Sequence, residues 1–107
     1  MQQLTATQLK AWLDDPARDQ PVLLDVREPW ELDVCRLPGS QPLPMRAVPA
    51  RHPELKRDAD IVIVCHHGAR SYQVAMFLEQ QGFGCIHNLY GGLAAWARDV
   101  DPTMPTY

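Results

Sequence analysis

The chain has 107 residues, of which 46% are hydrophobic, and its formal net charge is −3. This length suits one domain with one core, and the apolar content excludes a disordered chain. The negative charge gives no general attraction to nucleic acid or acidic lipid, and no apolar stretch approaches the ~20 residues of a membrane span. We therefore expect a single domain over residues 1–107, with neither nucleic acid nor membrane as a partner.

A helix, a strand and a second short helix are predicted at the start of the chain. Thr5 and Gln8 have the spacing of a helix-capping box, and apolar residues then recur at helical intervals up to Asp14. A strand is expected over residues 21–26, where aliphatic side chains dominate. Pro29 suits the first turn of a short helix.

Prolines dominate the next segment. Residues 36–53 are expected to be mostly loop, with a short strand near Leu43 and a turn of helix around Ala47. The remaining elements are, in chain order, a strand over residues 61–64, a helix over 71–81, a strand over 85–89, a helix opened by Gly91-Gly92 and a surface tail from Asp101. Strands alternating with helices predict an α/β fold, with a central parallel sheet and helices on both faces.

The most informative segment is Cys65–Arg70, CHHGAR, which joins a buried strand to a helix. In parallel sheets, ligands bind at the carboxyl ends of the strands, and a helix N-terminus favours anions. A thiol at such a place tends to ionise, and the thiolate is the reactive form. We expect Cys65 to be a nucleophile, in a cradle of backbone N–H groups from His66, His67, Gly68, Ala69 and Arg70.

The side chains of this loop allow more than one role. Gly68 would let the loop curl so that its N–H groups converge. Arg70 would clamp an anionic substrate or pair with a carboxylate such as Glu28 or Asp25. His66 and His67 would either tune the potential and shape of the site or relay protons near neutral pH. Both histidine roles stay open.

Several stretches, taken together, resemble the rhodanese family, whose sulfurtransferases carry sulfur as a cysteine persulfide. The Cys65–Arg70 loop resembles the family's active-site loop. The other matching stretches, in the family's order, are Leu23–Glu28, Leu37–Ser40 with Leu43-Pro44, and Asn88–Leu93 with Ala95-Trp96. The resemblance implies a rhodanese-like fold and a thiosulfate sulfurtransferase. Cys65 would take sulfur from a small anionic donor and pass it to cyanide or a thiol, an acceptor protein included.

Supporting roles are expected for charged residues outside the loop. Asp25, at a strand end, would cap loop N–H groups, and Arg27 with Glu28 would help to pin the loops together. Arg36 stands where many relatives carry His, and it would add positive charge near the mouth of the site. We expect no cofactor and no metal, because no spacing matches a paired-cysteine or helix-borne histidine site.

The cysteine content bears on the compartment. Three cysteines without a recognisable signal peptide favour unpaired thiols and a cytoplasmic protein. Cys35 and Cys85 are expected to pack as small apolar residues, and a redox role for Cys35 stays open.

Two other functions compete with sulfur transfer. A cysteine phosphatase or arsenate reductase can share this fold, but those loops resemble Cys-x5-Arg, whereas four residues separate Cys65 from Arg70. A non-catalytic binding module is the other alternative. Such modules usually lose the nucleophile, which is present in this chain.

Overall fold

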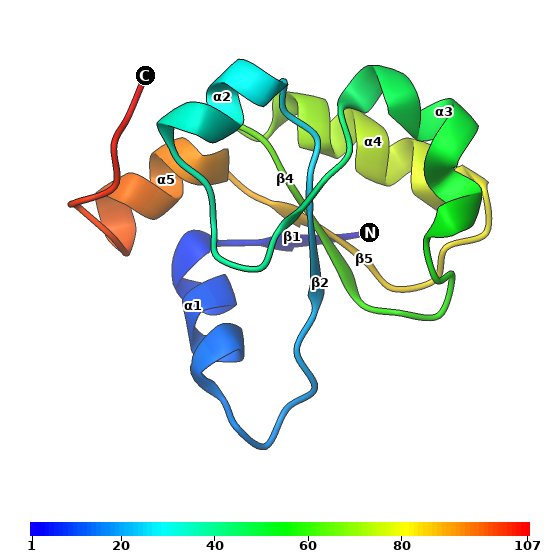
Figure 1. Cartoon of the computed structure of the whole chain (residues 1–107). Helices are drawn as coiled ribbons and strands as arrows, with labels where there is room; N and C mark the ends of the chain where they lie inside the picture. The colour runs from blue at the N-terminus through cyan, green and yellow to red at the C-terminus, as the bar shows by residue number, and fades with distance from the viewer.

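A parallel sheet forms the centre of the molecule in the computed structural model, which describes residues 1–107 (Figure 1). The elements in chain order are β1 (Gln2–Leu4), α1 (Ala6–Asp14), β2 (Val22–Asp25), α2 (Pro29–Val34), β3 (Gln41–Pro42), a 3-10 turn (Met45–Ala47), α3 (Val48–Arg51), a second 3-10 turn (His52–Glu54), β4 (Ile61–Val64), α4 (Ala69–Gln80), β5 (Ile86–Leu89) and α5 (Gly92–Asp99). The five strands have the order β1-β5-β4-β2-β3, and every neighbouring pair is parallel. The expected α/β architecture is confirmed.

Strand β4 shows how the two faces of the sheet are covered. Ile61 and Ile63 pack in a cluster with α3 and α4, whereas Val62 and Val64 pack in a second cluster with α1 and α5. None of these four side chains is more than 1% exposed. Alternate side chains of a strand point to opposite faces, so a strand covered on both sides must be apolar throughout. This burial fixes the position of the residue that follows, Cys65.

The carboxyl ends of the strands gather several loops at one edge of the sheet. Strands β2 and β4 run side by side with Asp25 opposite Val64, and the ladder continues because Val26 N–H donates to Val64 C=O at 3.0 Å. Figure 1 shows α2, the beginning of α4, α5 and the C-terminal tail around this edge. The loop after β4 therefore meets segments that are far apart in the sequence.

Some boundaries differ from the expectation. Strand β1 was not predicted, because the sequence Gln2-Gln3-Leu4 shows no alternation of apolar and polar residues; it is held as an edge strand by pairing with β5. Helix α4 begins at Ala69 rather than Ser71, directly after Gly68 in a left-handed conformation. None of the helices combines the length and the apolarity that a membrane-spanning segment needs.

Candidate active site

The sulfur of Cys65 lies where β4 ends and α4 begins, and Cys65 is only 1% exposed. Its Sγ accepts hydrogen bonds from Gly68 N at 3.0 Å and Ser71 N at 3.3 Å, and it lies 3.2 Å from Ser71 Oγ. Donors aimed at one atom stabilise negative charge there. The N–H groups of the other expected cradle residues make no hydrogen bond to this sulfur: His66, His67, Ala69 and Arg70.

The sequence analysis did not assign Ser71 to the site, although the sequence could have indicated it. It is fully buried, and it contributes both its N–H and its hydroxyl to the surroundings of Cys65. The sequence signal was a small hydroxyl residue in the first turn of the helix that follows the loop. First-turn N–H groups have no partner within their own helix, so they are available to the sulfur.

Gly68 makes the turn that the sequence predicted. Its φ is +97°, and a Cβ there would lie 3.1 Å from Gly91 N. Asn88 Nδ2 donates to Gly68 C=O at 3.4 Å, so β5 also contacts the backbone of Gly68. The expected curl of the loop is confirmed, and it depends on close packing against residues after β5.

The N-terminus of α5 supports the active loop from behind. Leu93 N–H donates to Cys65 C=O at 2.9 Å, and Ala94 N–H donates to His66 C=O at 3.0 Å. Gly92, with φ +61°, makes this approach possible: a Cβ there would lie 2.5 Å from Cys65 O and closer still to His66 O. Two helix N-termini, those of α4 and α5, therefore meet at one loop, and the sequence had assigned Gly92 only to opening a helix.

Arg70 is paired with a carboxylate that the sequence analysis did not name. Its Nη1 donates to Glu31 Oε1 at 2.6 Å and its Nη2 to Glu31 Oε2 at 2.8 Å. This bidentate bond is the main reason why the pKa of Glu31 falls to about 2. The prediction of Glu28 or Asp25 as the carboxylate partner of Arg70 was wrong. The Nε–H of Arg70 takes no part in the bond to Glu31.

Asp25 and Arg27 form a second ion pair, which is fully buried. Arg27 Nη2 donates to Asp25 Oδ2 at 2.7 Å, and both side chains are 0% exposed. Asp25 Oδ1 also accepts from Arg27 N at 3.1 Å, so the predicted cap on the loop backbone is confirmed. The expected pair between Arg27 and Glu28 does not form; Glu28 instead contacts Arg46.

The tail lies on the surface, as predicted, but its Tyr107 also reaches the site, which was not predicted. Tyr107 Oη accepts from Arg27 Nη1 at 3.0 Å and donates to Glu31 Oε2 at 2.6 Å, so one hydroxyl bridges the two ion pairs. Burial is the main cause that raises the pKa of Tyr107 to about 12. Its ring stacks on His66, which stacks on His67, with 4.0 Å between centroids in each case.

Comparison with known proteins identifies the family. The pattern of the Rhodanese-like domain matches residues 5–99. The chain belongs to the rhodanese family. This agreement confirms the resemblance that the four sequence stretches carried, and it supports a sulfurtransferase-type function for the chain.

Relatives of this chain include short and long proteins. A sulfurtransferase from Allochromatium vinosum is 47% identical over 83 residues, 78% of each chain. The chloroplastic rhodanese-like/PpiC domain-containing protein 12 of Arabidopsis thaliana is 38% identical over 94% of this chain, which spans only 35% of that protein. The crystal structure of a rhodanese-related protein from Thermoplasma volcanium has 28% identity and a TM-score of 0.83 over 94% of both chains.

Three residues outside the loop also had expected roles or positions. Arg36 is exposed and makes no hydrogen bond with the loop; it lines a separate cavity of about 740 Å³ that includes Trp96 and Met104. Cys35 is half-buried, as expected for a small packed residue, and its Sγ lies 3.9 Å from Arg27 Nη1. Cys85 is exposed, so the expectation that it packs in the interior was wrong.

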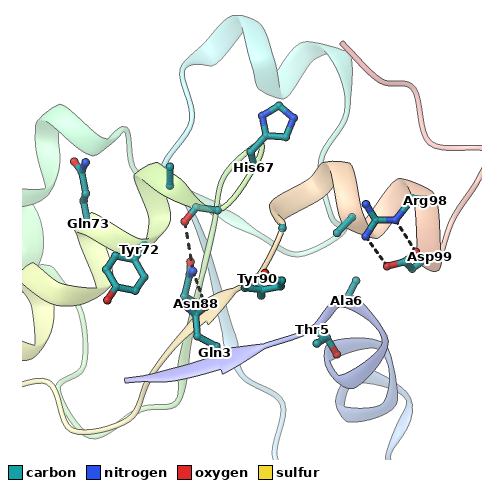
Figure 2. Close-up of a pocket in the computed structure, with 14 residues that line it drawn as sticks. Gln3, Thr5, Ala6, His67, Tyr72, Gln73, Asn88, Tyr90, Arg98 and Asp99 are labelled. Carbon is teal, nitrogen blue, oxygen red and sulfur yellow. Dashed lines mark hydrogen bonds and ion pairs between the residues drawn. The ribbon is translucent and has the colours of Figure 1, made fainter.

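A groove of about 850 Å³ lies beside the loop that follows β4 (Figure 2). His67, Gly68 and Ala69 line it, but Cys65 does not. Figure 2 shows Asn88 and Gln3 at its floor, joined by a hydrogen bond of 2.9 Å from Asn88 Nδ2 to Gln3 Oε1. Gly68, whose N–H donates to the sulfur of Cys65, therefore also lines this groove.

Glu31 should make the free energy of unfolding of this protein depend on pH in the acidic range. A carboxyl whose folded-state pKa is depressed stabilises the fold above its unfolded value of 4.5, and this contribution disappears as the pH falls through about 2. This lowering of the pKa corresponds to roughly 3 kcal/mol of folding free energy. Solvent screens little of it, because the Glu31 side chain is almost fully buried. We expect Glu31→Gln to unfold with a lower free energy than the wild type at pH 7, and this gap to narrow between pH 5 and pH 2. Urea unfolding at each pH measures it; a constant gap would contradict the assignment.

Proposed function

We propose that this protein moves sulfane sulfur from an anionic donor such as thiosulfate to cyanide or a thiol, through a persulfide on Cys65. The observation that carries the proposal is the sulfur of Cys65 with the N–H groups of Gly68 and Ser71 directed at it. Similarity to proteins named sulfurtransferases supports the same reaction class. The unpaired state of all three cysteines supports a reducing compartment such as the cytoplasm.

In the first step the Cys65 thiolate attacks the outer sulfur of thiosulfate. A bond forms between the two sulfurs, the S–S bond of the donor breaks, and sulfite leaves with the bonding electron pair. Cys65 then carries one extra sulfur atom, whose negative charge requires donors. We propose that the backbone from His66 to Arg70 supplies them, and that the Nε–H of Arg70, outside the Glu31 pair, attracts the anionic donor.

In the second step the acceptor attacks the outer sulfur of the persulfide. Cyanide becomes thiocyanate, or a thiolate becomes a persulfide, and the electron pair of the broken S–S bond returns to Cys65. No net oxidation is needed, because the sulfur transferred was already in the sulfane state. We propose that residues 1–107 form one domain that completes both steps, with an acceptor that is a small molecule or an acceptor protein.

Mass measurement tests the persulfide directly. Protein reduced beforehand and then incubated with thiosulfate should gain the mass of one sulfur atom, and cyanide should remove it. The added sulfur should map to the peptide that contains Cys65, not to those with Cys35 or Cys85. A gain on Cys85 alone, which is exposed, would mark unspecific chemistry and contradict the proposal.

Loop length separates sulfur transfer from phosphatase or arsenate reductase chemistry. A phosphorus or arsenic centre must place several oxygens among the N–H groups, whereas a persulfide adds one atom. The loop has four residues between Cys65 and Arg70, each adding at most ~3.3–3.6 Å of contour. The wild type should therefore convert cyanide to thiocyanate and show negligible release of aryl phosphate or reduction of arsenate. Cys65-dependent phosphatase turnover above sulfur transfer would reverse this assignment.

A further inference from the structure

We propose that residues 105–107 form a lid on the active loop, and that Tyr107 restricts which sulfur donors and acceptors reach Cys65. This inference deepens the proposed function and rests on it for the identity of the reacting molecules. The covering itself can be tested without sulfur transfer. The lid would favour small donors and acceptors over bulky ones.

Tyr107 covers the first residue after the nucleophile. Its ring lies on His66 at 4.0 Å between centroids, and its other flank meets Trp30 at 5.4 Å in an edge-on arrangement. The hydroxyl is held by Arg27 and Glu31, and Glu31 holds Arg70 of the loop. The lid is thus attached to the two charged pairs that flank the site.

The rest of the lid is weakly attached. Pro105 and Thr106 are exposed, and no backbone hydrogen bond holds residues 105–107. The last anchored residue before them is Met104, which is half-buried against the α1 and α5 cluster and donates its N–H to Asp101 C=O at 3.1 Å. Opening therefore breaks the two hydrogen bonds and the aromatic contacts of Tyr107, and it does not involve the core contacts of Met104.

The space left under the lid is small. Beside the stacked rings of Tyr107 and His66, a cavity of about 150 Å³ lies between the lid and the loop. Its lining residues, which do not include Cys65 itself, are Cys35, His66, His67, Leu93, Ala94, Pro105, Thr106 and Tyr107. One water molecule occupies ~30 Å³ in the liquid, so a few non-hydrogen atoms fill this cavity. Molecules of the size of thiosulfate or cyanide fit, whereas a protein segment or an aromatic donor requires the lid to move.

Alkylation of Cys65 with two reagents of the same chemistry tests the lid. Iodoacetamide and its fluorescein derivative differ in size, and modification can be quantified on the Cys65 peptide by mass spectrometry. Tyr107→Ala should accelerate the fluorescein derivative about tenfold or more, because the lost bonds raise the open fraction, and iodoacetamide much less. Tyr107→Phe, which keeps the ring but loses the hydroxyl, should give an intermediate acceleration.

A matched control is Tyr90→Ala, since Tyr90 is an exposed tyrosine that lines the groove and makes no contact with Glu31 or His66. It should leave both rates unchanged. Equal acceleration of both reagents by Tyr107→Ala would mean general loosening, and no acceleration would mean that the lid does not limit access; either result overturns the inference. Persulfide formation from thiosulfate is measured separately, so a failure of sulfur transfer is distinguishable from a failure of the lid.

Discussion

Replacing Cys65 by Ser should abolish conversion of cyanide to thiocyanate, with a loss of about 10³-fold or more. The hydroxyl of Ser is not ionised near neutral pH, and it cannot carry a persulfide. Because the replacement is nearly isosteric and Gly68 and Ser71 can donate to oxygen as well as sulfur, the variant should fold. Initial rates with thiosulfate and cyanide, with circular dichroism as a check on folding, give the measurement.

The other two cysteines provide matched controls. Cys85→Ser changes an exposed thiol, and Cys35→Ser changes a half-buried one beside Arg27. Both variants should keep most of the activity. Full activity in Cys65→Ser, or a loss confined to Cys35→Ser, would remove Cys65 from the proposed reaction.

The second large effect is expected at Gly92. In Gly92→Ala the new Cβ would meet the carbonyl oxygens of Cys65 and His66, and neither backbone group is able to move without displacing the loop. We expect the free energy of unfolding to fall by roughly 3 kcal/mol or more, and sulfur transfer to fall at least tenfold in the protein that remains folded. Urea unfolding and activity measured on the same preparation test both parts.

Gly39→Ala separates steric contact from backbone strain. Gly39 has a similar positive φ of +77°, but a Cβ there would meet nothing within 4 Å. This variant should lose only the cost of a left-handed conformation, about 1–2 kcal/mol, and it should keep its activity. If the two variants were equally stable and equally active, the packing of Gly92 on the loop would have no functional importance.

The sheet and the loop were predictable because their signals are local. Four consecutive β-branched residues give β4 its bounds, and the capping pair Thr5 and Gln8 gives α1 its start. Gly68 was identified for the same reason: a left-handed turn between a strand and a helix requires glycine, and this is decided by neighbouring residues.

The parts that sequence reasoning missed depend on contacts between distant segments. Glu31 meets Arg70 across 39 positions and Tyr107 across 76, and no local pattern marks an acidic residue on a short helix as their common partner. Strand β1 is similar, since it exists only by pairing with β5. A short polar stretch and an exposed tail carry no periodicity from which such contacts could be inferred.

The hydrogen bonds from α5 to the active loop have an electronic consequence. The peptide units after Cys65 and after His66 each accept a bond on the carbonyl side, from Leu93 and Ala94. There are no cis peptide bonds, so the amide N–H groups of His66 and His67 lie in those peptide planes and point in the direction opposite to the carbonyl groups, away from the donors of α5. A peptide polarised at its oxygen becomes a stronger donor at its nitrogen. Through two planar groups, the positive end of α5 thus strengthens the amides that follow Cys65, although the helix makes no hydrogen bond to the sulfur itself.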